Sequence, residues 1–225
     1  GSEMCIRDSD AHRRTMIKHG WSKLFDVDIL DAEGPDLELP IPNGKRIQKN
    51  LVGKDIKNYD SMLVLSHFKG HPMGGYGGAL KQLSIGCASS AGKAWIHSGG
   101  QTTDQYTLWE HCAEQDTFLE AMADAASTVT KHFAGKIAYV AVMKNLSVDC
   151  DCCAVAEDPC MNDVGILSSL DPVALDRACI DLVRNSNDPG RDHFMERVNS
   201  RHGTHTIDAA EALGIGTQDY KLVRV

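Results

Sequence analysis

Apolar positions along the chain follow two spacings, one typical of helices and one typical of extended strands. Helical spacing, together with residues that cap or end a helix, predicts helices over residues 10–19, 114–133, 171–184, 192–200 and 207–213. Short continuous or alternating apolar runs predict strands over residues 25–30, 61–65, 136–143, 164–167 and 221–225. Helices and strands that alternate in this way indicate an α/β fold. We expect a mostly parallel central sheet with helices on both faces.

One β-hairpin is predicted near the start of the chain. The dipeptide Asn43-Gly44 lies between extended arms in the segment 37–45, and Asn-Gly is the strongest short signal for a hairpin turn. Pro40 and Pro42 cannot donate to a sheet ladder, so the hairpin belongs at an edge. No internal repeat and no low-complexity linker follows, and we expect residues 10–225 to form a single α/β domain.

Residues 1–9 differ in character from the rest of the chain. Gly1 and Ser2 resemble a cloning remnant, and residues 3–9 resemble translated sequencing adapter of the kind found in metagenomic reading frames. The stretch has neither the apolar segment nor the small-residue cleavage site of a secretory signal. We therefore leave this tail out of the fold prediction.

Composition and charge narrow the class of protein. The 225 residues are 42% hydrophobic and 24% charged, which is a globular composition with enough chain for a sizeable core. No apolar run approaches the roughly 18–20 residues that a membrane-spanning helix needs, so no membrane partner is expected. The net charge of −8 argues against a broad nucleic-acid-binding surface, and any bound anion needs a local site.

A glycine-rich segment follows the predicted strand 61–65, at the end where open α/β sheets bind ligands. Its backbone N–H groups could approach an anion at Gly74, Gly75, Gly77 and Gly78, and a helix that begins near Gly77 would add its positive end. The side chains expected to line this crevice are His67, Lys69, His71, Lys81 and His97. The alternative is a tight loop with solvated histidines. The segment lacks both the Walker spacing and Gly-x-Gly-x-x-Gly, so nucleotide binding is not supported.

Four of the eight cysteines crowd into the segment 150–160, which favours a ligand cluster in a reducing cytoplasm over a disulfide scaffold. These candidate metal ligands are Cys150, Cys152, Cys153 and Cys160. Thiolates at this density suit an iron–sulfur cluster or, alternatively, zinc. Redox or disulfide chemistry, and packing without a ligand, are the remaining interpretations. The carboxylates of Asp149, Asp151 and Asp163 are expected to raise the thiol pKa values unless a cation binds, which favours a metal.

Four ordered segments resemble a known family. They are SHFKGHPMGGYGGALKQLSIG (66–86), KAWIHSGG (93–100), NLSVDCDCC (145–153) and DVGILSSLDPVALDRACIDLV (163–183). Together they are similar to domain of unknown function 362, whose members are often labelled as iron–sulfur-centre proteins. The resemblance runs from about Asp10 to Val225 and implies an α/β fold with a Cys-Asp-Cys segment at 150–152. Members usually begin with a further α/β portion, which we expect to be missing here, and many carry a separate ferredoxin-type domain.

These observations lead to three functional expectations. The first is a cytoplasmic metal- or iron–sulfur-binding protein with a redox role, in which the cysteine cluster lies beside the glycine-rich crevice. The second is an enzyme that acts on a small anionic metabolite, with a crevice histidine as general base and a lysine holding the anion. The third is an interaction module with structural zinc. Loss of a neighbouring α/β portion would expose apolar surface or a sheet edge, so we also expect a homo-oligomer.

Overall fold

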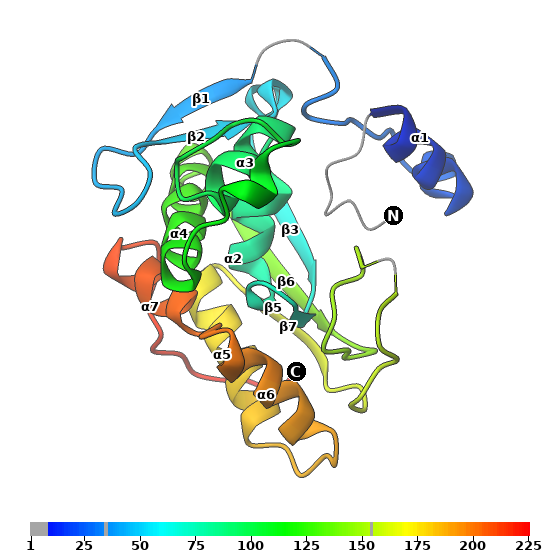
Figure 1. Ribbon diagram of the computed structural model, residues 1–225. Coiled ribbons are helices and arrows are strands. Elements are labelled where there is room, and N and C mark those ends of the chain that lie inside the picture. Colours follow the sequence, from blue (N-terminus) through cyan, green and yellow to red (C-terminus); the bar gives the residue numbers. More distant parts are fainter. Residues whose placement is uncertain (1–8, 34–35, 154) are drawn as a thin grey trace.

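The computed structural model describes residues 9–33, 36–153 and 155–225 (Figure 1). Its α-helices are α1 (Ser9–Lys18), α2 (Ala79–Lys81), α3 (Ser90–His97), α4 (Gln115–His132), α5 (Pro172–Arg184), α6 (Arg191–Ser200) and α7 (His205–Ala212). Its strands are β1 (Leu37–Pro40), β2 (Lys49–Val52), β3 (Met62–His67), β4 (Lys69–His71), β5 (Gly75–Gly77), β6 (Ile137–Met143) and β7 (Gly165–Ser169). The predicted α/β class is confirmed.

The main sheet has the strand order β3-β6-β7 and is mixed. β3 runs parallel to β6, with Met62 opposite Ile137, whereas β7 runs antiparallel to β6, with Met143 opposite Gly165. The prediction of a mostly parallel sheet is therefore wrong. A parallel neighbour needs a crossover connection, usually a helix. The described part of the segment 144–164 contains no helix and returns the chain alongside β6 in the opposite direction.

Helices cover one face of this sheet. α2 and α5 contact β6, and Figure 1 shows α2, α4 and α5 on the same side of the strands. Because side chains alternate across a strand, Val64, Tyr139 and Met143 point into this core and are buried. On the other face Leu63 and Leu65 are 60% and 62% exposed, so the described residues place no helix over them. The prediction of helices on both faces is wrong for this part of the chain.

The predicted hairpin forms, but with a longer connection. β1 and β2 pair in the antiparallel direction as a sheet of their own, so they are not an edge of the main sheet. The second strand begins only at Lys49, because the connection is bound to α4. There the buried carboxylate of Asp124 accepts hydrogen bonds of 2.6–3.0 Å from three successive backbone N–H groups, those of Lys45, Arg46 and Ile47.

Most of the other predicted elements are present within a few residues of their expected bounds. The start of α5 follows the sequence signal closely, since the Asp171 carboxylate accepts from the backbone N–H groups of Val173 and Ala174, with Pro172 at the first helical position. The predicted strands 25–30 and 221–225 are wrong, because no strand among the described residues pairs with them. α3 was not predicted; Ser89 caps it by accepting from the Gly92 N–H.

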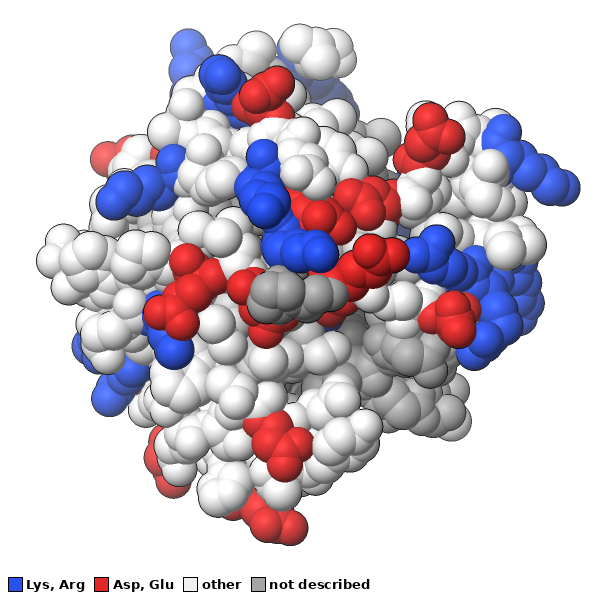
Figure 2. Space-filling view, turned by 90° about the horizontal axis from the view of Figure 1, so that it is seen from above, with Lys and Arg blue, Asp and Glu red and all other residues white. Residues whose placement is uncertain are grey.

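No helix of the described chain carries a stretch long and apolar enough to cross a membrane. Figure 2 shows acidic and basic side chains interspersed over the face seen from above.

Candidate functional site

The segment 144–164, here called the cysteine loop, carries the four clustered cysteines between β6 and β7. The loop is folded back on itself by a bridge between Leu146 and Met161. An ion pair and a histidine–carboxylate hydrogen bond hold it to α6: Arg197 Nη1 lies 3.2 Å from Asp149 Oδ1, and His193 Nε2 lies 2.8 Å from Glu157 Oε2. The loop is therefore fixed to the body of the protein.

The glycine-rich segment is not an open loop, because β4 and β5 form a short antiparallel hairpin that packs on the cysteine loop. The Gly70 N–H donates to the Ser147 carbonyl at 2.7 Å. A Cβ atom on residue 70 would lie 2.2 Å from the Val148 carbonyl oxygen, so only glycine permits this approach. The close contact places His71 beside Cys150.

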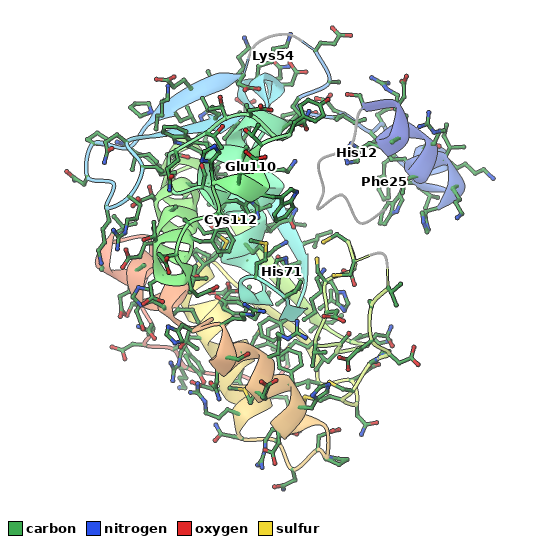
Figure 3. All side chains as sticks on the ribbon, viewed as in Figure 1. His12, Phe25, Lys54, His71, Glu110 and Cys112 are labelled. Atoms are coloured by element: carbon green, nitrogen blue, oxygen red, sulfur yellow. The ribbon has the colours of Figure 1, made fainter. Side chains whose placement is uncertain are left out.

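Three potential ligand atoms come together at this junction. The ring of His71 and the sulfurs of Cys150 and Cys152 offer atoms that all lie within 4.8 Å of one another, a group that could hold a metal ion. The two Sγ atoms are 2.8 Å apart, with the Cys152 thiol donating to Cys150. His71 and Cys150 are buried, and Cys152 is half-buried. In Figure 3 His71 lies near the middle of the molecule.

Hydrogen bonding fixes the proton position on His71. Its Nδ1 accepts from the backbone N–H groups of Met73 at 3.2 Å and Gly74 at 2.9 Å. Burial lowers the pKa of His71, which keeps the ring neutral near pH 7. A neutral ring that accepts at Nδ1 carries its proton on Nε2. Nε2–H is therefore the group that can donate to the sulfurs.

The Cys150 sulfur lies among donors and positive charges. A hydrogen bond from Cys152 lowers the pKa of Cys150 well below its usual value, against the opposing effect of burial, and His71, Lys81 and Lys69 lower it further. We expected the neighbouring carboxylates to raise the thiol pKa values. For Cys150 that expectation is wrong, and the reason lies in what those carboxylates contact.

Each of the three carboxylates near the cysteines has a cationic partner. Asp149 pairs with Arg197, and Asp163 Oδ2 lies 3.4 Å from Lys144 Nζ. Asp151 accepts from His67 Nδ1 at 2.9 Å and also from Lys69. The hydrogen bond to Asp151 is the main cause of the raised pKa of His67, whose Nε2 contacts the Lys144 carbonyl at 2.6 Å. Both ring nitrogens of His67 are thus engaged in holding the cysteine loop.

The structure does not bring the four predicted cysteine ligands together. Within the described chain, the group of potential metal ligands includes Cys150 and Cys152 but neither Cys153 nor Cys160. The Cys160 thiol instead donates to the Leu146 carbonyl at 3.3 Å. His71, predicted to line the crevice, takes the third position. None of the seven cysteines that the structure describes forms a disulfide.

The expected anion position at the start of α2 is filled by the protein itself. The Asp176 carboxylate accepts from the backbone N–H groups of Ala79 at 2.7 Å and Leu80 at 3.0 Å, and from the Tyr76 hydroxyl at 3.1 Å. Asp176 is fully buried. Its position on the apolar stripe of α5, with Cys179, Ile180 and Val183, is the sequence signal that indicates burial.

The remaining predicted residues lie around this junction. All four glycines of the crevice are buried, and they serve the hairpin and its packing: Gly74, Gly75, Gly77 and Gly78. His97 is also buried; it stacks on Phe118 and its Nδ1 contacts the Lys93 carbonyl at 2.7 Å. Burial lowers the pKa of His97 to about 4. Lys81 ends α2 on the side of Cys150, where its charge affects both Cys150 and His71.

Comparison with known protein families gives one match, over residues 1–181, to the family described as Domain of unknown function (DUF362). Neither a curated protein nor a solved structure matches the chain. We expected the resemblance to run from about residue 10 to 225. The match instead includes residues 1–9, so it gives no support to a missing N-terminal portion, and it ends within α5. Because it spans well over half of the residues, the chain belongs to the DUF362 family.

Proposed function

We propose that the protein is a thiol–disulfide redox protein in which Cys150 is the attacking thiolate and Cys152 the resolving thiol. The observation that carries the proposal is the 2.8 Å separation of the two sulfurs beside a histidine whose proton lies on Nε2. The thiolate, and not the thiol, is the reacting form of cysteine, and a positively charged environment favours the thiolate. A reducing cytoplasm is the compartment in which such a pair would start as a dithiol.

The exchange needs no bound cofactor, because the cysteine pair is the reductant and the substrate disulfide is the oxidant. The Cys150 thiolate attacks one sulfur of a substrate disulfide, forms a mixed disulfide and releases the first substrate thiolate, which takes a proton from solvent. Cys152 then loses its proton and attacks Cys150 Sγ, which forms the intramolecular disulfide and releases the second substrate thiolate. Two electrons pass from the protein to the substrate. The His71 Nε2–H would stabilise the negative charge on Cys150 at the start of the reaction.

Two features favour this chemistry over a metal site. A histidine that ligates a metal usually donates its other ring N–H to an acceptor, whereas His71 accepts at Nδ1 from two backbone N–H groups. The Cys152 thiol also donates to Cys150 Sγ, so the two sulfurs contact each other directly, as a resolving thiol and the sulfur that it attacks must.

Disulfide mapping tests the proposal. Anaerobically reduced protein is treated with a small disulfide, the free thiols are blocked, and the peptides are identified by mass spectrometry. We expect one Cys150–Cys152 disulfide per chain, and we expect Cys152→Ser to accumulate a mixed disulfide on Cys150. Cys153→Ser and Cys160→Ser are matched controls that keep the reaction, because neither residue belongs to the group. A Cys150 that reacts no faster in the folded than in the unfolded protein would overturn the proposal.

A second candidate function is binding of a thiophilic metal ion, which the grouping of Cys150, Cys152 and His71 favours. Three protein ligands are typical of a zinc site that keeps one position open. An iron–sulfur cluster is less well supported, since clusters are usually held by four cysteines. Zinc that binds at one ion per chain, is lost in Cys150→Ser, is kept in Cys160→Ser and blocks disulfide formation would support this candidate instead.

A further inference from the structure

We infer that the substrate of this site carries an anionic group next to its reacting sulfur, and that Lys81 binds that group. The inference rests on the proposed function and adds the chemical class of the substrate: a low-molecular-weight disulfide or thiol with a carboxylate or a similar anion. It follows from the positions of the two lysines beside the cysteine pair and from what each lysine contacts.

Lys69 and Lys81 reach the site side by side over Gly77. A Cβ atom on residue 77 would lie 3.3 Å from Lys81 Cδ and 3.7 Å from Lys69 Cε, so the absence of a side chain there leaves room for both aliphatic stems. Gly77 pairs with Lys69 across the β4–β5 hairpin, and the same hairpin carries His71. The two lysines thus lie next to the junction where the sulfurs meet the histidine.

The two lysines differ in their partners. Lys69 forms an ion pair with Asp151, and its side chain is only 12% exposed. Lys81 has no carboxylate within 4.0 Å among residues 9–33, 36–153 and 155–225. The carboxylate of Asp176, which lies at the start of the helix that carries Lys81, is held by the backbone N–H groups of Ala79 and Leu80. Lys81 is therefore a half-buried cation beside the reacting sulfur, with its charge available.

An available cation at that position discriminates between substrates. When the Cys150 thiolate attacks, it approaches the substrate closely, so a negatively charged substrate group meets repulsion from the thiolate unless a cation compensates. Lys81 supplies this compensation, and it attracts an anionic substrate before contact. A cationic disulfide gains nothing from Lys81 and is repelled by it.

Three disulfides that differ in charge test the inference. Dithiodiglycolate is anionic, bis(2-hydroxyethyl) disulfide is neutral and cystamine is cationic. The rate of the Cys150 reaction with each is measured on reduced protein at low and high salt. We expect the anionic probe to react at least about tenfold faster than the cationic probe at low salt, with the difference shrinking at high salt.

Variants of Lys81 test whether the preference for the anionic probe depends on this residue. Lys81→Met should remove most of the difference between anionic and cationic probes, and Lys81→Arg should keep it. Lys57→Met, in the short helix Lys54–Asn58 that precedes the start of β3, makes the same change in net charge and should leave the preference unchanged. Equal rates for all three probes, or an unchanged preference in Lys81→Met, would overturn the inference while leaving the redox function standing. No reaction with any probe would instead refute the proposed function.

Discussion

The carboxylate of Asp176 lies so close to Gly78 that a side chain at residue 78 would collide with it. A Cβ atom there would lie 2.4 Å from Asp176 Oδ1. The backbone of residue 78 is extended, a conformation that any amino acid adopts. Glycine is therefore required only because the Asp176 carboxylate lies so close. Through it, α5 and the start of α2 are joined by a buried, negatively charged hydrogen-bond acceptor.

Changes at either residue should destabilise the fold. Asp176→Asn replaces one acceptor oxygen by an N–H₂ group that faces existing donors, and Gly78→Ala pushes the carboxylate away. A buried polar group left without its partner costs about 1–3 kcal/mol, and we expect losses of at least about 2 kcal/mol in the free energy of unfolding by urea denaturation. Asp192→Asn, on an exposed side chain, is the control. A loss equal to that of the control would contradict the role of Asp176.

Acid should weaken the fold through Glu120, which is buried on α4. Burial acts to raise the pKa of Glu120, but hydrogen bonds from Lys45, His205 and Arg46 outweigh it and lower the pKa to about 2. Because the pKa in the folded state lies below its ordinary value of 4.5, the ionised carboxylate stabilises the fold above about pH 4.5. This stabilisation is lost as the pH falls from 4.5 toward 2.

The contribution of Glu120 can be measured as a difference between variants. The free energy of unfolding of wild type and Glu120→Gln should differ most near pH 7 and converge as the pH approaches 2. Glu38→Gln, whose carboxylate is 58% exposed and pairs with Lys49, should show little pH-dependent difference from wild type. A constant gap between wild type and Glu120→Gln at all pH values would show that folding does not shift the pKa of this carboxylate.

Gly70→Ala should separate the β4–β5 hairpin from the cysteine loop, because its Cβ atom would lie 2.2 Å from the Val148 carbonyl oxygen. We expect a slower reaction of Cys150 with small disulfides, since His71 and Lys69 move away from the sulfur. Gly86→Ala is the control, because its Cβ would meet only the movable end of the Gln82 side chain. An unchanged Cys150 rate in folded Gly70→Ala protein would show that the hairpin does not activate the thiol.

The cysteines should differ in their reaction with iodoacetamide. Cys150, with its lowered pKa, should already be alkylated near pH 6, whereas burial raises the pKa of Cys87 to about 11 and keeps its thiol protonated. Alkylation followed by peptide mass spectrometry from pH 5 to 9 measures both sites in one sample. Reaction of Cys150 only above pH 8 would contradict its thiolate character.

We propose that the open face of the main sheet joins two copies of the chain. Leu63 and Leu65 on β3 and Ile166 on β7 lie on this face and are each at least 60% exposed. Leu63→Ser together with Leu65→Ser should lower the molar mass measured by light scattering. Wild type that is monomeric at high concentration would exclude this assembly.

Patterns within short stretches of sequence predicted most of the helices and strands. They could not predict contacts between segments that lie far apart in the sequence. Asp171 and Pro172 predict the start of α5 because a cap acts within four residues. The direction of β7 depends on whether the preceding segment forms a helix. The sequence of the cysteine loop has neither a clear helical nor a clear extended pattern, so it did not predict this direction. In the site, Cys150 and Cys152 were found through their spacing, whereas the role of Gly70 depends on a carbonyl far along the chain. The charges around Cys150 were misjudged, since the partners of Asp149 and Asp151 come from β3, β4 and α6.

The antiparallel pairing of β7 with β6 also has a consequence for the order of folding. That pairing closes only the cysteine loop, whereas the pairing of β3 with β6 closes the long stretch that includes α3 and α4, and longer closures lose more chain entropy. The cysteine loop can thus form before β4, which carries His71 and Lys69, packs against it. During that interval its thiols are unprotected, so refolding in a reducing buffer should give a higher yield of active protein than refolding in air.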